Sequence, residues 1–520
     1  MESGSPQTHL EHEAKLIAAA SFRMPTLDGA APWLVIHEPR HEVLKAAYFD
    51  TSDLALIRAG ITLRHRRSNN EGSWTLKFPV DTNRVALVRQ EISFTGARGR
   101  VPVGAIDLTR AVTRFQPLTL VARLNTARTI VELHDAHGQL AVEVVDDNVS
   151  VYEGSRCTMR FREIEVELHS HTKPSVKALQ AIVKRLVAAG AVPEQPQSKL
   201  ARGLGDRTKA PADVEHEVLS ARDWKHADTR QLVRHVLCAS VIEMIRHDAG
   251  VRLDLDPEHL HAYRVATRQL RSNLRTYSPL LDPEWTAALR AELAWLGASL
   301  GAVREADVLS KWLQSQHSTL PRRHRRALGS IAKHLTDQRV EARQVLLADM
   351  RSPRYDRLID QLCQATRQPS FNRDRKTHLE RSALEVGPRF TRRTWRTLQR
   401  AVDAAAAADN PSVDTLHKIR IYAKRCRYAA EALGPAIGKP VRRFAQRLSE
   451  LQGTLGELHD ADVAERWLGE AAQVVPGAAG CVDYLIALGR TRRKHAEDEW
   501  PPMVRDLADS RKLAAWLNPK

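Results

Sequence analysis

The sequence has little cysteine, few aromatic residues and no long apolar run. Its five cysteines are scattered and odd in number, and none belongs to a Cys-x-x-Cys pair, which argues against a disulfide framework or a zinc site. No run of about 18 apolar residues is available to span a bilayer, and the N-terminal residues lack the basic-then-apolar order of a signal peptide. We therefore expect a soluble protein of a reducing compartment, such as the cytoplasm.

Aromatic residues make up only 5% of the chain, whereas charge of one sign is in excess. The 79 lysines and arginines outnumber the 62 aspartates and glutamates, which gives a formal net charge of +17. Such an excess predicts an anionic partner: nucleic acid, a membrane surface or a phosphate-rich small molecule. The basic segments have no interleaved aromatic rings to stack on bases, so nucleic acid is not the expected partner.

The two halves of the chain have different hydrophobic periods. Up to about residue 170, short segments of alternating apolar and polar residues are separated by turn sequences such as NNEG and HDAHG. This predicts an antiparallel β body (residues 1–207), with a helix over 175–191 and a linker at 208–214. From 215 to 515 the apolar period is 3.6, interrupted at prolines, which predicts an all-α bundle. The expected fold class is therefore α+β.

The helical half contains an internal repeat. LHAYRVATRQLRSNLR (260–275) aligns with LHKIRIYAKRCRYAAE (416–431), and LAWLGASLGAVREADV (293–308) aligns with LSELQGTLGELHDADV (448–463). Two separate blocks at nearly one offset are hard to obtain by chance, so we predict a duplication with copies at about 225–350 and 376–497. Because this period is much longer than that of solenoid repeats, the copies should close on each other rather than stack.

One face of the first repeated segment is cationic. Its basic residues recur at steps of three and four, the spacing of side chains along one face of an α-helix. The second copy repeats the pattern, with Glu431 at the fifth position. A solvated surface is the ordinary explanation for one such face, but the duplication favours a basic cleft in which arginine forks bind a chain of phosphates. The candidate polyphosphate-binding residues are His261, Arg264, Arg268, Arg271, Arg275, His417, Arg420, Lys424 and Arg427.

Several predicted strands carry charge at every second position. EHEAK (11–15), EIEVE (163–167) and LRHR (63–66) each place their charged residues on one side of a strand. An outward polar face is the ordinary explanation for a single strand. In a sheet that closes on itself, however, these residues would line a lumen. Clustered carboxylates suit Mg²⁺ or Mn²⁺ and clustered arginines and lysines suit phosphates, so the pattern predicts metal-dependent phosphoryl transfer.

The N-terminal half resembles the CYTH superfamily, the triphosphate tunnel metalloenzymes. EHEAK is similar to their ExExK signature, and the resemblance continues in order through YFDT, LRHR, TLK, RQE, EIEVEL and SKLARGLG. The helical half resembles the CHAD domain, whose two characteristic segments are similar to LHAYRVATRQLR and LHKIRIYAKRCRY. These resemblances imply an eight-stranded antiparallel β tunnel followed by a helical domain that binds inorganic polyphosphate.

The CYTH resemblance also implies roles for individual residues. Members of the superfamily hydrolyse inorganic triphosphate, thiamine triphosphate or RNA 5′-triphosphate ends, and a few make cyclic AMP. Basic residues would clamp the triphosphate and take part in catalysis: Lys15, Arg64, Arg66, Lys77, Arg89, Arg128 and Lys199. Carboxylates would hold one or two Mg²⁺ or Mn²⁺ ions: Glu11, Glu13, Glu143, Asp147, Glu163, Glu165 and Glu167. The predicted activity is a divalent-metal-dependent inorganic triphosphatase.

Three other functions remain open at this point. Both halves could hold polyphosphate without hydrolysing it, which would make the protein a polyphosphate-granule targeting module. An adenylate cyclase would need an adenine pocket, and the sequence identifies none. Nucleic-acid binding is the third. The complete set of expected carboxylates favours the enzyme, with inorganic triphosphate and polyphosphate as its partners and the cytoplasm, with its polyphosphate granules, as its location.

Overall fold

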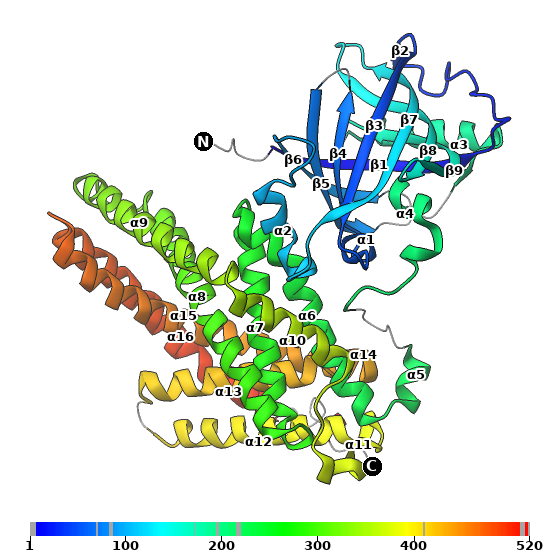
Figure 1. Cartoon of the computed structure of the whole chain (residues 1–520). Coiled ribbons are helices and arrows are strands. Elements are labelled where there is room, and N and C mark those ends of the chain that lie inside the picture. Colours follow the sequence, from blue (N-terminus) through cyan, green and yellow to red (C-terminus); the bar gives the residue numbers. More distant parts are fainter. Residues whose placement is uncertain are drawn as a thin grey trace. The chain divides into compact units, whose positions relative to one another are not determined.

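The computed structural model describes residues 7–68, 71–82, 87–170, 172–193, 197–214, 220–408, 411–509 and 515–517. The chain divides into two compact units, Met1–Asp213 and Val214–Lys520. Figure 1 shows that the strands belong to the first unit and the long helices to the second. None of the helices in the described ranges combines the length and the apolar character needed to cross a membrane.

The first unit is an antiparallel sheet that closes on itself. Its long strands pair in the order β1-β6-β5-β4-β3-β7-β8-β9, and β9 pairs with β1 again, so eight strands enclose a tunnel within the described residues. The short strands β2 (Val35–Ile36) and β10 (Val192–Pro193) pair with β7 and β1. The predicted α+β class with an N-terminal antiparallel sheet is confirmed. The tunnel strands are β1 (Gln7–Ala18), β3 (Arg40–Asp50), β4 (Thr62–Ser68), β5 (Glu71–Thr82), β6 (Leu87–Phe94), β7 (Thr119–His134), β8 (Leu140–Glu153) and β9 (Arg156–Leu168).

Alternation along the strands separates an apolar outer face from a charged lumen. On β8 and β9, Val142, Val144 and Ile164 are fully buried on the outer side, where helix α3 (Lys173–Ala188) covers them. Burying each such side chain contributes about 1.5–3 kcal/mol. Helix α3 begins two residues before the predicted helix because the Thr172 side chain caps it and a proline occupies its first turn.

One end of the tunnel is closed by an apolar plug. Helices α1 (Ala55–Arg58) and α4 (Lys199–Leu204) pack there against Val149 and Val151 of β8. Gly203 permits the close approach of α4, because a Cβ at this position would lie 2.8 Å from Val151. Neither α1 nor helix α2 (Val103–Thr113) was predicted from the sequence, because both lie between strands whose alternation dominated the pattern.

The second unit is a bundle of long helices with one large apolar core (Figure 1). Prolines stand in the first turn of α7, α8 and α10, after the capping side chains of Asp256, Asp282 and Ser352. The prolines therefore begin helices rather than only interrupting them. The helices are α5 (Ala221–His226), α6 (Thr229–Leu253), α7 (Pro257–Thr276), α8 (Pro283–Gln316), α9 (Arg325–Met350), α10 (Pro353–Arg367), α11 (Lys376–Leu379), α12 (Ala383–Ala406), α13 (Val413–Glu431), α14 (Gly434–Ile437), α15 (Lys439–Val474) and α16 (Ala479–Asp509).

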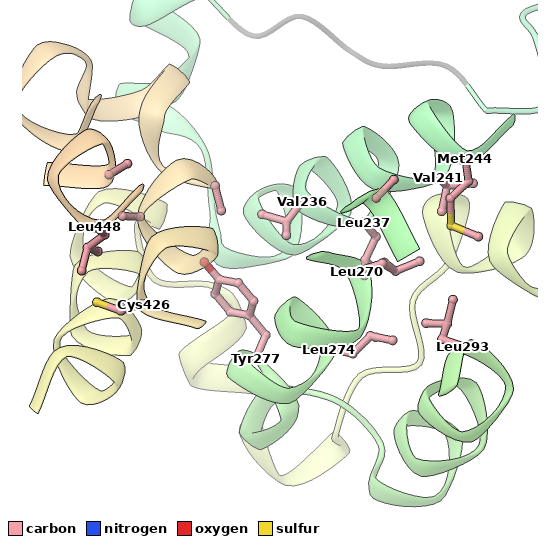
Figure 2. Close-up of a cluster of buried hydrophobic side chains, with 14 of the residues drawn as sticks. Val236, Leu237, Val241, Met244, Leu270, Leu274, Tyr277, Leu293, Cys426 and Leu448 are labelled. Atoms are coloured by element: carbon pink, nitrogen blue, oxygen red, sulfur yellow. The ribbon is translucent and has the colours of Figure 1, made fainter. Parts of the chain in front are cut away.

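The two repeated segments occupy corresponding helices. Helix α7 packs on α8 as α13 packs on α15, and α7 also packs on α13. Figure 2 shows residues of both copies in one core, among them Leu270 and Leu293 of the first copy and Cys426 and Leu448 of the second. These are pairs related by the repeat offset. The copies therefore contribute equivalent positions to one shared core instead of forming two separate ones.

Candidate functional site

The charged residues that alternate along the strands line one cavity of about 210 Å³ in the tunnel. At about 30 Å³ per water molecule this is room for roughly seven waters, enough for a small polyanion. Strand register places the lining residues in rows that cross neighbouring strands. The lining residues are Glu13, Lys15, Tyr48, Thr62, Arg64, Arg66, Lys77, Glu91, Arg128, Glu143, Glu165, Glu167, Ser198 and Lys199.

Two lysines share buried carboxylates in the middle of the cavity. The Lys15 Nζ lies 3.4 Å from Glu163 and also contacts Glu165. The Lys199 Nζ, brought in by α4, lies 3.1 Å from Glu163, 2.7 Å from Glu165 and 3.0 Å from Asp147. Burial alone would lower the pKa of each lysine, but the carboxylates raise both pKa values above their usual range. Both lysines are therefore fixed cations.

Arg128 completes this network from β7. Its Nε and Nη2 donate to the two carboxylate oxygens of Asp147, at 2.8 and 2.7 Å, and its Nη2 lies 3.5 Å from Glu165. Burial would raise the pKa of Glu165, but Lys15, Lys199 and Arg128 together hold it well below its usual range. Removing one partner from such a buried network leaves an uncompensated charge, which costs about 3–5 kcal/mol.

The opposite wall, formed by β4 and β5, carries an excess of positive charge. Arg64 and Arg66 extend from alternate positions of β4, and Lys77 of β5 lies 2.9 Å from Glu91. The pKa of Arg66 is lowered to about 10, first by the neighbouring Arg64, then by burial and Arg128. Cations that depress one another's pKa values in this way favour a bound anion.

The structure divides the predicted metal-binding carboxylates into two groups. Asp147 and Glu163 have fully buried side chains whose nearest charged groups are Lys199, Arg128 and Lys15, so their contacts are those of charge partners for the cations. Glu13, Glu143 and Glu167 form a row across β1, β9 and β8, at the end of the tunnel away from the plug, and Glu13 in this row also lies 3.3 Å from the Lys15 Nζ.

Two predicted residues, Glu11 and Arg89, are opposite each other on β1 and β6, but their side chains lie outside the described residues. His169, by contrast, was not predicted. One ligand atom each from His169, Glu143 and Glu167 lies within 4.8 Å of the others. The alternation of EIEVE continues to position 169, which is the sequence signal that would have identified this histidine.

In the helical unit, basic residues of α7 and α13 converge. The Arg268 Nε of α7 donates to the hydroxyl oxygen of Tyr428 on α13 at 3.1 Å. Burial lowers the pKa of Lys424 to about 6, with further lowering by Arg420, Arg268 and Arg264. Four of the predicted polyphosphate-binding residues, two from each copy, therefore form one group, which we call the cationic cluster: Arg264, Arg268, Arg420 and Lys424.

Helices α8 and α15 each have a glycine next to an arginine of the cationic cluster. A Cβ on Gly301 of α8 would lie 3.6 Å from the Nη2 of Arg264, and a Cβ on Gly456 of α15 would lie 3.4 Å from the Nη2 of Arg420. The two glycines are related by the repeat offset, as are the two arginines. The glycines therefore let both guanidinium groups lie close to the helix backbone, where the repeat places them equivalently.

The other predicted residues of the helical unit lie outside the cationic cluster. Arg271 and Arg275 are exposed. Burial, followed by the nearby Arg275, lowers the pKa values of Arg290 and Arg425, two cations that were not predicted from the sequence. Arg427 is engaged within its own copy: its Nη1 donates to the Ser449 hydroxyl at 2.9 Å, and its Nε lies 3.3 Å from the Glu431 carboxylate.

The two predicted histidines have similar surroundings in the two copies. Burial, and then nearby cations, lower the pKa of His261 and of His417. The ring of His417 lies 4.8 Å from that of His459, and Arg304 takes the place of His459 in the first copy. Both histidines are thus neutral neighbours of the cationic cluster near pH 7, rather than additional fixed charges.

Comparison with known protein families gives a match in each unit. Residues 9–187 match the CYTH domain and residues 235–469 match the CHAD domain. An uncharacterized protein of Mycobacterium tuberculosis strain H37Rv, Rv2226, is 29% identical over 498 residues, which cover 90% of each chain. The uncharacterized protein MT2285 of strain CDC 1551 gives the same values. The similarity to these proteins therefore extends over both units.

Two solved structures are similar to part of the chain. The CHAD domain of the plant Ricinus communis is 27% identical, and the match covers 58% of this chain and 98% of that one, with a TM-score of 0.45. PptA from Streptomyces chartreusis is 22% identical, and the match covers 54% of this chain and 100% of that one, again with a TM-score of 0.45.

Proposed function

Since the chain consists of a CYTH domain and a CHAD domain, as the sequence motifs predicted, we propose that its tunnel hydrolyses inorganic triphosphate and that its helical unit binds inorganic polyphosphate. The observation that carries the first part is the cavity itself. Cations on β4, β5, β7 and α4 face a space of triphosphate size, and carboxylates lie beside them. A cavity with both signs of charge suits an anionic substrate that is bound together with a divalent cation.

The cations would bind the substrate and stabilise the charge of the reaction. Arg64, Arg66 and Lys77 line one wall, and Lys15 and Lys199 line the other. Arginine forks can donate two parallel hydrogen bonds to a phosphate group, whereas lysine acts as a point charge. Because the three lysines are already held by carboxylate partners before the substrate arrives, little reorganisation of these groups is needed as negative charge spreads over the phosphoryl oxygens.

The acidic row at the end of the tunnel fits a divalent metal ion. Glu13, Glu143 and Glu167 offer the carboxylate oxygens that Mg²⁺ and Mn²⁺ prefer, and CYTH domains are metal-dependent. A bound ion would polarise a phosphoryl oxygen and lower the pKa of a coordinated water. Glu13, which lines the cavity beside Lys15, would orient the water that attacks phosphorus, and phosphate and pyrophosphate would be the products.

The lining of the cavity favours a substrate that is a triphosphate without a nucleobase. Among its lining residues in the described part of the chain, Tyr48 is the one aromatic side chain, and it lies next to Arg64, which lowers its pKa although burial would raise it. A tyrosine engaged with an arginine provides no apolar face for an adenine ring. This supports a triphosphatase over an adenylate cyclase.

The cationic cluster supports polyphosphate binding by the helical unit. Four cations converge there from two helices, and Arg264 and Arg420 have pKa values lowered first by burial. A chain of phosphates would supply charge to several of these groups at once, whereas a single carboxylate could serve one or two. Polyphosphate binding without hydrolysis in either unit is the second candidate function, since the same cations would also hold a polyanion that does not react.

The first experiment is to measure phosphate and pyrophosphate release by the purified chain. Inorganic triphosphate, thiamine triphosphate, ATP and long-chain polyphosphate are each supplied with Mg²⁺ or Mn²⁺. We expect triphosphate turnover by the wild type and a loss of at least about 100-fold in Glu13→Ala. The matched control is Glu153→Ala, an exposed carboxylate paired with Arg207 at the far end of β8. Tight polyphosphate binding without turnover of any substrate would support the second candidate function instead.

A further inference from the structure

We propose that Glu143, Glu167 and His169 form a transition-metal site at the end of the tunnel, and that this site binds Mn²⁺ in preference to Mg²⁺. The inference deepens the proposed function, on which the role of the metal rests, because it assigns a nitrogen ligand and a class of metal. It is carried by three observations: the backbone that holds the three side chains together, the distances between their ligand atoms, and the charges around them.

The backbone of β8 and β9 places the three residues on one side of the sheet. Glu143 and Glu167 are direct partners in the register of the two strands. His169 lies two residues beyond Glu167, so its side chain continues the same face. Its backbone N–H donates to the carbonyl oxygen of Ala141 at 3.1 Å, which extends the pairing of the two strands past the end of β9. The histidine is therefore held beside Glu143 by main-chain hydrogen bonds.

The distances suit one coordinated ion. A ligand atom from each of the three side chains lies within 4.8 Å of the other two. Two ligands on opposite sides of an ion with bond lengths of about 2.1 Å are about 4.2 Å apart, and adjacent ligands are closer. The three groups are therefore close enough to share one ion after a small inward movement of the side chains, and the exposed imidazole of His169 can move without disturbing the core.

The charges in this row favour a cation. Across β1, β9, β8 and β7, the row contains Glu13, Glu167, Glu143 and Glu132, four carboxylates in succession. Directly opposed like charges destabilise a sheet. Glu143 makes no hydrogen bond or ion pair with any described residue, although it faces Glu132 on one side and Glu167 on the other in the strand register. A divalent ion between Glu143 and Glu167 would remove this repulsion.

The three deeper carboxylates differ from this row in their partners. Asp147, Glu163 and Glu165 are neutralised by Lys15, Lys199 and Arg128, as described above. A metal ion there would have to displace a buried cation. In the row at the end of the tunnel, the Glu13 carboxylate lies 3.3 Å from Lys15 and that of Glu132 lies 3.2 Å from Arg40, whereas the described residues give Glu143 no ion pair. Glu143 is therefore the carboxylate whose charge a metal would compensate.

The imidazole of His169 indicates which class of metal ion the site would prefer. Carboxylates alone suit Mg²⁺, which is reluctant to give up its water, whereas an imidazole nitrogen suits first-row transition metals. Two carboxylates and one imidazole on one face, with the remaining positions open, would leave room for substrate oxygens. Mn²⁺ is the probe of choice because its unpaired electrons report directly on a coordinated nitrogen.

The test is to titrate the full chain with Mn²⁺, without any substrate, and to record electron paramagnetic resonance spectra with detection of ¹⁴N coupling. We expect the wild type to bind Mn²⁺ with imidazole coupling and to resist displacement by Mg²⁺. In His169→Ala that coupling should be lost and the affinity of the site should fall at least about tenfold. The matched control His137→Ala removes an exposed histidine from the β7–β8 turn and should change neither property. His169→Gln keeps an oxygen donor, so it should retain Mn²⁺ while losing the nitrogen coupling.

The readout separates this inference from the proposed function. A spectrum without nitrogen coupling in the wild type, or coupling that persists in both His169 variants, would overturn the assignment whatever the enzyme does. Nitrogen-coordinated Mn²⁺ in a chain that hydrolyses no triphosphate would support the site and overturn the proposed activity.

Discussion

Lys199 and Lys424 are both buried lysines, yet their surroundings move their pKa values in opposite directions. Lys199 contacts three carboxylates of the tunnel, which raise its pKa although burial would lower it. Lys424 lies among three arginines, which add to the effect of burial and lower its pKa to about 6. The same residue type is therefore a fixed cation in one unit and a titrating group in the other.

Polyphosphate binding should take up a proton at Lys424 near neutral pH. Above pH 6 the free protein holds this lysine mostly neutral, and a bound polyanion stabilises its charged form. The affinity should therefore fall as the pH rises from about 6 to about 8, by up to about tenfold per pH unit through this residue. Isothermal titration calorimetry in buffers with different ionisation enthalpies measures the proton uptake.

Lys424→Arg is the matched variant for this effect, because its guanidinium stays charged across the whole range. It should bind polyphosphate without proton uptake and with a flatter pH profile. Burial, and then nearby cations, lower the pKa values of the neighbouring His417 and His459, that of His459 to about 4. Wild-type pH dependence in Lys424→Arg would assign the effect to another group.

At the scale of strands and helices, the sequence predicts which way a side chain points better than it predicts which distant residues come into contact. The pleat of a strand fixes a period of two, so the lumen-facing charges of β1, β4 and β9 could be recognised before the sheet was known to close. Lys199 has no such signal. It enters the cavity only because α4 packs against β8 over Gly203, and that contact depends on residues about 50 positions apart, Val151 and Gly203.

The cationic face of α7 shows the same limit of prediction from sequence. A period of 3.6 predicts one basic face from His261 to Arg275, but two crossing helices contact each other over only part of their length. Arg264 and Arg268 meet Arg420 and Lys424, whereas Arg275 is exposed beyond the contact. His169 was missed because it stands just past the end of the predicted strand, although the alternation of the strand continues to it.

The glycines of the long helices give a prediction at this scale. Replacing Gly456 of α15 by leucine places a side chain where Arg420 now lies, because even a Cβ would be 3.4 Å from its Nη2. We expect polyphosphate affinity to fall about tenfold or more through the displaced guanidinium. Gly453→Leu is the control: it lies one turn earlier on the same helix, is exposed, and has no atom within 4 Å of the place a Cβ would occupy. Both changes add similar helix propensity, so equal binding by the two variants would contradict the role of the glycine.

The molecule as a whole carries two concentrations of basic residues, one in each unit. Lys15, Lys199 and Arg128 of the tunnel are matched by buried carboxylates, whereas Lys424 of the cationic cluster lies chiefly among arginines. The two sites should therefore differ in salt dependence. Binding at the cationic cluster should weaken more steeply as ionic strength rises, because less of its charge is compensated within the protein.

The last prediction concerns the independence of the two units. Arg264→Ala with Arg420→Ala removes one arginine from each copy of the cationic cluster, and it should weaken polyphosphate binding strongly while triphosphate turnover stays within about twofold of the wild type. Glu13→Ala should strongly reduce triphosphate turnover while polyphosphate binding stays close to that of the wild type. The expectation follows from the structure, since the tunnel cavity and the cationic cluster belong to separate units and share no residue among those described. Polyphosphate binding and triphosphate hydrolysis are measured on the same preparations of both variants. Equal losses of binding and turnover in the double arginine variant would mean that one polyanion occupies both sites at once, and a long polyphosphate chain bound by the helical unit would then be the substrate presented to the tunnel.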